Sequence, residues 1–141
     1  MTKDIVRQNT QIPSALSVWF VIHFVVDMLF AIPLFFAPEA FLSLVSWRVI
    51  DPFASRLVAA ALFGVGIESW LGRNASIDAF KHLLNLKIIW SFTAVVGLLI
   101  SIIQGGPNTP LIVWLIVLIF AIFNAAWIYW RVQIRKMIEG G

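Results

Sequence analysis

Five strongly polar side chains are the main site candidates inside the long apolar segments of this sequence: His23, Asp27, Glu68, Lys87 and Asn124. His23 and Asp27 are four residues apart, a spacing that puts both on one face of a helix, one turn from each other. A carboxylate beside an imidazole fixes its tautomer and stabilises its cation, so this pair could pass a proton or bind a polar ligand. The alternative is a hydrogen-bonded pair that only holds helices together.

Glu68 and Lys87 fall at similar depth on what we predict to be consecutive antiparallel helices. An ionisable group costs at least about 2.5–3.5 kcal/mol to insert at membrane depth, so such groups tend to pair. We therefore predict a Glu68–Lys87 ion pair, with extension of Lys87 to the lipid headgroups as the alternative.

Ser91 and Asn124 are the remaining polar candidates at this level. Ser91 shares a helical face with Lys87. The Asn124 amide could complete the cluster, although an asparagine between membrane helices commonly serves as a structural contact. Because each predicted span contributes at least one member, we expect a polar pocket that opens toward the cytoplasm.

Small and polar residues recur at every fourth position of the second apolar segment: Arg56, Ala60, Gly64, Glu68 and Gly72. Small residues let a neighbouring backbone come close, so we predict that this stripe faces the bundle. Arg56 is a secondary site candidate, and the alternative is that it extends to the lipid headgroups.

Catalytic and metal-binding patterns are absent from the sequence. It has two histidines and no cysteine, and neither histidine belongs to a Glu-x-x-His or His-x-x-x-His pattern. Phosphate loops, nucleophile elbows and nucleotide fingerprints are also missing. We therefore expect no catalytic residue, no metal and no cofactor. The basic residues suit anionic lipid, so we expect no nucleic-acid partner.

The composition is that of a membrane protein, because 61% of the 141 residues are hydrophobic and 12% are charged. Soluble chains carry about 25% charged residues, and a helix crosses the bilayer with about 20 apolar residues. Short connections favour antiparallel neighbours. We predict one all-α transmembrane domain over residues 1–141, an antiparallel four-helix bundle with spans at 14–36, 55–71, 83–103 and 111–130.

The stretch 38–50 is too short to span and mixes apolar residues with Glu39, Ser43 and Arg48. We predict a short amphipathic helix at the membrane surface, with an ordinary loop as the alternative. Pro38 ends the first span, Asp51-Pro52 precedes the second, and Gly105-Gly106-Pro107 closes the third. Proline and glycine in these places are typical helix boundaries.

The basic residues predict the orientation, because lysine and arginine accumulate in cytoplasmic loops. With both termini inside, eight of the ten basic residues lie on the cytoplasmic side: Lys3, Arg7, Arg73, Lys81, Lys87, Arg131, Arg135 and Lys136. Only Arg48 and Arg56 lie outside. We expect a multi-pass protein of the cell membrane, plasma or inner, with both termini in the cytoplasm.

Residues 35–71 resemble the DoxX-like superfamily of small four-helix membrane proteins. The likeness lies in "FFAPEAFLSL" after the first span and in "RLVAAALFGVGIESWL", which opens with Arg56 and runs through Gly64 and Gly66. It covers about a quarter of the chain. The resemblance implies a four-helix membrane fold and, for some members, a role as accessory subunit of a membrane redox system. It carries no catalytic signature.

Three functional hypotheses follow, in order of preference. The first is a non-enzymatic protein that binds a partner subunit or a small amphipathic molecule such as a lipid or quinone through the polar pocket. Beside the lipid bilayer, the partners that we expect are a membrane subunit or further copies of the chain in a homo-oligomer. The second is a small proton-coupled transporter or channel that uses Asp27, His23 and Glu68. The third is a membrane enzyme for a lipid-soluble substrate, with His23 and Asp27 as the acid–base pair.

Overall fold

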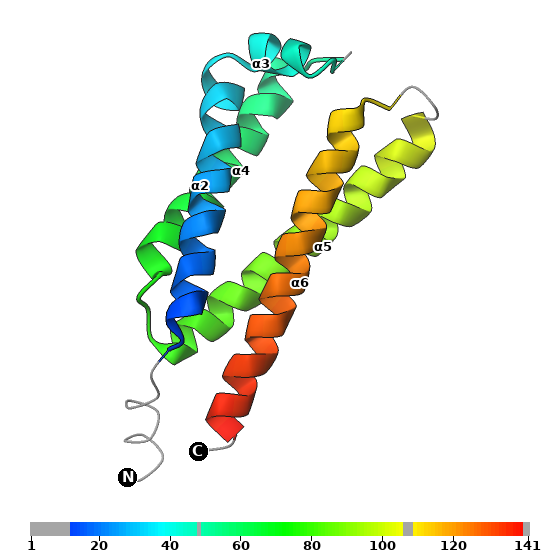
Figure 1. Cartoon of the computed structure of the whole chain (residues 1–141). Coiled ribbons are helices and arrows are strands. Elements are labelled where there is room, and N and C mark those ends of the chain that lie inside the picture. The colour runs from blue at the N-terminus through cyan, green and yellow to red at the C-terminus, as the bar shows by residue number, and fades with distance from the viewer. Residues whose placement is uncertain (1–11, 48, 106–108, 140–141) are drawn as a thin grey trace.

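The computed structural model describes residues 12–47, 49–105 and 109–139, and these residues form five helices and no strand (Figure 1). Lys3, Arg7, Arg48 and the Gly106-Pro107 turn lie outside the described residues, so the predictions made for them stay predictions. The helices are α2 (Ser14–Phe36), α3 (Pro38–Leu44), α4 (Pro52–Gly72), α5 (Ile77–Gly105) and α6 (Leu111–Glu139).

Four of these helices, α2, α4, α5 and α6, are long and apolar enough to cross a membrane. They contain the four predicted spans, and the chain is a multi-pass α-helical membrane protein. α5 and α6 have 29 residues each, a length of about 43 Å at 1.5 Å per residue. Because the hydrocarbon core is about 30 Å thick, both helices extend beyond it.

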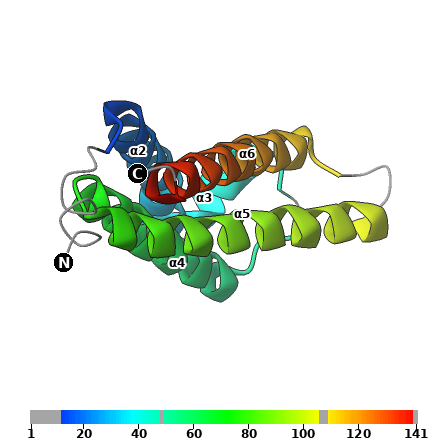
Figure 2. The same ribbon diagram turned by 90° about the horizontal axis from the view of Figure 1, so that it is seen from below.

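The four long helices are arranged as two pairs. α2 packs along α4, and α5 packs along α6, whereas α4 and α5 have few contacts although they are consecutive. Figures 1 and 2 both show the α5–α6 pair tilted away from the α2–α4 pair. We call the end that holds the first turn of α2 and the last turn of α6 the terminal end, and the opposite end the α3 end.

The apolar core that joins the two pairs lies toward the terminal end. The Phe20 ring of α2 meets Phe80 of α5 and Trp127 of α6 edge to face, with ring centroids 4.9 and 5.6 Å apart. Such aromatic pairs stabilise by about 0.5–1.5 kcal/mol beyond the area they bury. The buried members of this core are Leu16, Phe20, Ile77, Phe80, Leu84, Phe123, Trp127, Trp130 and Ile134.

The short helix between the first two spans is confirmed, but its predicted end at residue 50 is wrong. α3 ends at Leu44, and the next residues form a Schellman cap. The Ser46 amide donates to the Ser43 carbonyl, and the Trp47 amide donates to the Leu42 carbonyl at 3.0 Å. Ser46 adopts a left-handed conformation, with φ of 61°, which turns the chain and terminates the helix.

The predicted stripe on α4 does not face the bundle along its whole length. The buried residues of α4 are Ser55, Ala59, Leu62, Gly66 and Ser69, whereas Arg56, Ala60 and Gly64 are exposed. A helix has 3.6 residues per turn, so positions spaced by four rotate by about 40° per step and by about 160° over the stripe. Only Glu68 and Gly72, at the terminal end, rotate into partly buried positions.

Candidate functional site

Ser69 lies at the centre of a buried polar cluster and joins three helices. Its Oγ accepts a hydrogen bond from Nζ of Lys87 on α5 at 2.5 Å. The same Oγ lies 3.0 Å from Nδ1 of His23 on α2 and donates to the Val65 carbonyl one turn earlier on α4 at 2.7 Å. The hydroxyl therefore connects the α2–α4 pair to α5.

The contacts of Ser69 determine the tautomer of His23. A serine hydroxyl has a single hydrogen and an ammonium group can only donate. Because the Ser69 hydrogen goes to Val65 and Lys87 donates to Oγ, Nδ1 of His23 must carry the hydrogen of its contact with Ser69. Asp27 Oδ2 lies 3.2 Å from the same nitrogen, so the predicted pairing of His23 with Asp27 on one face of α2 is confirmed.

The predicted ion pair between Glu68 and Lys87 is confirmed, with 3.3 Å between Oε2 and Nζ. The Lys87 side chain is fully buried, whereas that of Glu68 is 30% exposed. Nζ also lies 4.8 Å from the centre of the Phe20 ring and 5.6 Å from the Trp127 ring, where the aromatic faces attract a cation. Lys87 therefore points into the bundle and does not extend to lipid headgroups.

Asn124 reaches the cluster through α5. Its Nδ2 donates to Ser91 Oγ at 2.9 Å and to the Ile88 carbonyl at 3.0 Å, and Ser91 donates to the Lys87 carbonyl at 2.6 Å. These contacts hold α6 against α5 beside the ionisable groups. Aromatic rings of α6 complete the enclosure, since Phe123 and Trp127 contact the His23 ring edge to face at 4.7 and 5.2 Å.

Arg56 lies apart from the cluster. Its side chain is exposed, and Nε donates to the carbonyl of Phe35 at 3.1 Å. Arg56 precedes Glu68 by 12 residues, about 18 Å along a helix. The guanidinium therefore fastens the end of α2 to the start of α4 at the α3 end.

Sequence reasoning missed Ser69, and the only signal for it is its place beside Glu68. A serine in a helix commonly bonds the carbonyl one turn back, as Ser69 does with Val65, and this gives no reason to expect further partners. Its contacts with His23 and Lys87 depend on how α4 is rotated against α2 and α5.

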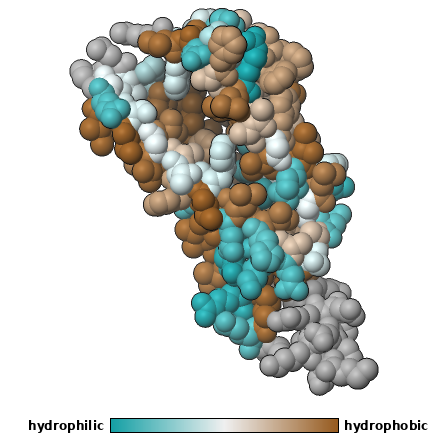
Figure 3. All heavy atoms as spheres, turned by 180° about the vertical axis from the view of Figure 1, so that it is seen from behind, coloured by the Kyte–Doolittle hydropathy of each residue, from teal (hydrophilic) through white to brown (hydrophobic). Residues whose placement is uncertain are grey.

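The polar cluster is mostly buried, and Glu68 is the member with a 30% exposed side chain, whereas we expected an open pocket at this place. His23, Asp27, Lys87 and Ser91 are 3%, 6%, 0% and 2% exposed. A cavity of about 380 Å³ lies at the α3 end, between the α3–α4 connection, the last turns of α5 and the first turn of α6. Figure 3 shows the surface hollowed between the two helix pairs in this half of the molecule.

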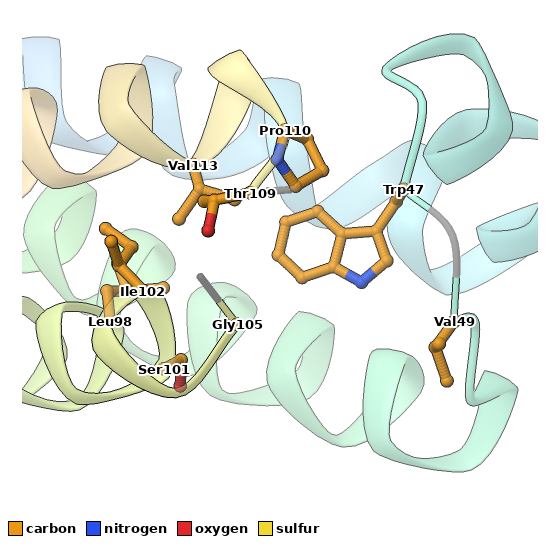
Figure 4. A pocket seen from close by; sticks show the side chains of 9 residues that line it. All are labelled: Trp47, Val49, Leu98, Ser101, Ile102, Gly105, Thr109, Pro110 and Val113. Atoms are coloured by element: carbon orange, nitrogen blue, oxygen red, sulfur yellow. The ribbon is translucent and has the colours of Figure 1, made fainter. Parts of the chain in front are cut away.

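We call this cavity the cleft. The Trp47 indole faces the end of α5 and the start of α6 across it, and the hydroxyls of Ser101 and Thr109 lie on its wall (Figure 4). The remaining wall is apolar. The lining residues are Trp47, Val49, Leu98, Ser101, Ile102, Gly105, Thr109, Pro110 and Val113.

The part of the chain that the structure describes has no group of three histidine, aspartate or glutamate residues that could hold a metal ion. The fold and the site thus define a small multi-pass membrane protein with a buried ionisable cluster and an apolar cleft. No family model matches the chain, and no curated protein or solved structure shows significant similarity to it.

Proposed function

We propose that this protein is a non-enzymatic membrane protein that binds a small amphipathic molecule, of the lipid or quinone class, in the cleft. The cleft itself is the observation that carries the proposal. Its volume of about 380 Å³ falls in the range of about 300–1,000 Å³ that is usual for small-molecule sites. Such sites are mostly apolar with a few placed polar groups, which describes this wall.

The chemistry of the wall favours a molecule with an apolar tail and a modestly polar head. Leu98, Ile102 and Val113 offer aliphatic contacts. In an empty cleft these side chains lack dispersion contacts on one side, and an apolar tail would supply them. Ser101 and Thr109 bring hydroxyls to the same wall. Trp47 adds an indole, a group that prefers the boundary between apolar and wet surroundings. No ionised side chain lines the cleft, so a neutral head fits best.

We further propose that the protein resides in the plasma or inner membrane with its terminal end in the cytoplasm. Arg73, Lys81, Arg131, Arg135 and Lys136 gather at this end, as the rule for cytoplasmic basic residues requires. The cleft then belongs to the outer leaflet. Kinship with the DoxX-like superfamily, whose resemblance spans residues 35–71, stays a proposal and would agree with an accessory role.

The binding proposal is tested by filling the cleft. Ser101→Trp places a large ring on the cleft wall at an exposed position, and Ile103→Trp adds the same ring two residues away, where the side chain is 80% exposed and does not line the cleft. Native mass spectrometry after gentle extraction, with a short-chain ubiquinone and a monoacylglycerol as added probes, should show a bound probe on the parent and on Ile103→Trp. Ser101→Trp should lose it.

Two results would overturn the binding proposal. One is a parent protein that retains neither probe nor any other small molecule. The other is retention by Ser101→Trp at the level of Ile103→Trp. A protein subunit held at the cleft in place of a small molecule would replace the proposed ligand with the partner-subunit alternative.

A second candidate function, proton-coupled transport, is favoured by the charge balance of the polar cluster. With a neutral imidazole, the carboxylates of Asp27 and Glu68 and the ammonium of Lys87 sum to a net charge of −1. Uptake of one proton makes the cluster neutral, which suits an apolar interior where net charge is costly. In addition, Oδ2 of Asp27 is buried and makes no hydrogen bond within the described residues.

Transport is tested with proton flux into liposomes that contain the protein and a pH-sensitive dye. Asp27→Asn should abolish the flux. Asp78→Asn changes an exposed carboxylate in the first turn of α5 and should leave the flux intact. Flux that persists in Asp27→Asn, or a parent protein without flux, rules out this candidate.

A further inference from the structure

A second cavity, of about 260 Å³, lies at the terminal end between the start of α5 and the last turns of α6. Its wall is mainly charged: Lys81, Arg131, Arg135, Ile138 and Glu139. Three cations and one carboxylate sum to a net charge of +2. It belongs neither to the polar cluster nor to the cleft, and we call it the basic pocket.

We propose that the basic pocket binds a phosphate-bearing anion, and that in the membrane this anion is the headgroup of an acidic phospholipid. Guanidinium groups recognise phosphate through paired charge-assisted hydrogen bonds. Basic pockets between transmembrane helices on the cytoplasmic side are known to bind anionic headgroups.

Arg131 is held ready for such a ligand. Its Nε donates to Oδ1 of Asn85 on α5 at 2.7 Å, and the side chain is half-buried. This bond uses one of the five N–H donors of the guanidinium. It also fixes the planar group between the two helices, so little side-chain freedom is lost when an anion binds.

Arg135 has a partner that a phosphate could replace. Its Nε lies 2.8 Å from Oε1 of Glu139, but the two side chains are 69% and 62% exposed. Exposed pairs of this kind contribute little to stability. Glu139 reduces the positive charge of the basic pocket, but the pocket keeps a net charge of +2 with Glu139 in place.

The depth of the pocket fits a lipid headgroup. The third and fourth predicted spans cover residues 83–103 and 111–130, so Lys81 and Arg131 lie just beyond the hydrocarbon core on the same side. Lipid phosphates lie in this layer, and each basic residue near an anionic surface adds to the attraction.

The experiment measures lipid retention by native mass spectrometry of the full chain. The protein is extracted from mixed micelles that contain equal amounts of phosphatidylglycerol and phosphatidylcholine. We expect preferential retention of phosphatidylglycerol, reduced about tenfold or more in Lys81→Gln/Arg131→Gln, because this variant loses two cations that attract the headgroup. Lys136→Gln removes an exposed charge at the same end outside the pocket and should retain the lipid.

Asn85→Ala separates the role of charge from that of helix packing. It removes the bond to Arg131 but keeps the guanidinium, so it should retain far more phosphatidylglycerol than the double variant. Inorganic phosphate is the second arm. If millimolar phosphate displaces phosphatidylglycerol, the pocket is a phosphate site that free phosphate can also occupy. If phosphate leaves the retention of phosphatidylglycerol unchanged, the lipid headgroup is the bound anion.

Three outcomes would overturn the proposal. The first is equal retention of the two lipids by the parent protein. The second is a loss of phosphatidylglycerol in Lys136→Gln as large as in the double variant. The third is an equally large loss in Asn85→Ala. None of these measurements depends on the cleft, so failure here leaves the function proposed for the cleft intact.

Discussion

Ser69 is a small side chain of the polar cluster with hydrogen-bond partners on three helices. Ser69→Ala removes the acceptor of Lys87 and the partner of His23 Nδ1, and loss of such buried contacts costs about 1–3 kcal/mol. We expect a clearly lower melting temperature in detergent. Thr93→Ala is the control, because the Thr93 hydroxyl is exposed and bonds only carbonyls of its own helix. Equal melting of the two variants would contradict a structural role for Ser69.

Glu68 and Lys87 should respond unequally to mutation, because only Lys87 is fully buried. Glu68→Gln leaves an ammonium group in the core with a weakened partner, and an uncompensated buried charge costs about 3 kcal/mol or more. Lys87→Met keeps an apolar chain against Phe20 and leaves a carboxylate that is partly exposed.

We therefore expect the free energy of unfolding to be highest in the parent, lower in Lys87→Met and lowest in Glu68→Gln. The double variant should be close to Lys87→Met. Unfolding in increasing fractions of a denaturing detergent gives these values. A double variant less stable than both single variants would contradict the ion pair.

At the residue scale, the spacing of His23 and Asp27 and the matched depth of Glu68 and Lys87 were enough to predict both pairs. These predictions depend on helix periodicity and on the cost of unpaired charge. Ser69 could not be predicted in this way, since its contacts with other helices depend on tertiary geometry.

At the scale of the helix pair, Gly66 decides how closely α4 approaches α2. A Cβ at Gly66 would lie 2.7 Å from Cβ of Asp27 and 2.8 Å from Cε of Met28, whereas a Cβ at Gly64 would meet nothing within 4 Å. Gly66→Ala forces the backbones apart, and such overpacking costs about 1–3 kcal/mol. Gly64→Ala should be neutral or stabilising, because alanine favours the helix. Thermal melting of both variants checks this contrast, and a similar loss in both would refute it.

The cap after α3 offers a second test at this scale. Ser46 is in the left-handed region, which costs a residue with a side chain about 1–2 kcal/mol. Ser46→Gly should relieve part of this strain and raise stability. Ser46→Val should lower stability and displace Trp47, because a β-branched residue is a rare outlier there. Melting temperature and tryptophan emission report the two effects, and an unchanged or improved Ser46→Val would contradict the cap.

The helices themselves were predictable, and their faces were less so. Continuous apolar stretches with proline and glycine boundaries predicted all four spans. The stripe from Arg56 to Gly72 was assigned to one helix face because residues four positions apart were treated as lying directly above one another. Each step of four residues in fact moves the side chain by about 40° around the helix axis. The end of α3 escaped prediction because Ser46 takes a conformation usually reserved for glycine.

At the scale of the whole molecule, the division into two helix pairs creates both the cluster and the cleft. Large aromatic side chains join the pairs toward the terminal end, through Phe20, Phe80 and Trp127. At the α3 end the pairs diverge (Figure 1), and the cleft lies between them (Figure 3). The sequence did not predict this opening, because membrane helices are apolar on the faces toward lipid as well as toward their neighbours.

The most direct test of binding in the cleft is photocrosslinking in the native membrane. A benzophenone side chain is placed at Ile102, which lines the cleft, or at Ile103, which is exposed on the same helix. Mass spectrometry then identifies the adducts. Binding in the cleft predicts one dominant amphipathic molecule at position 102 and a mixture that reflects bulk lipid at position 103. The same bulk mixture at both positions would contradict it.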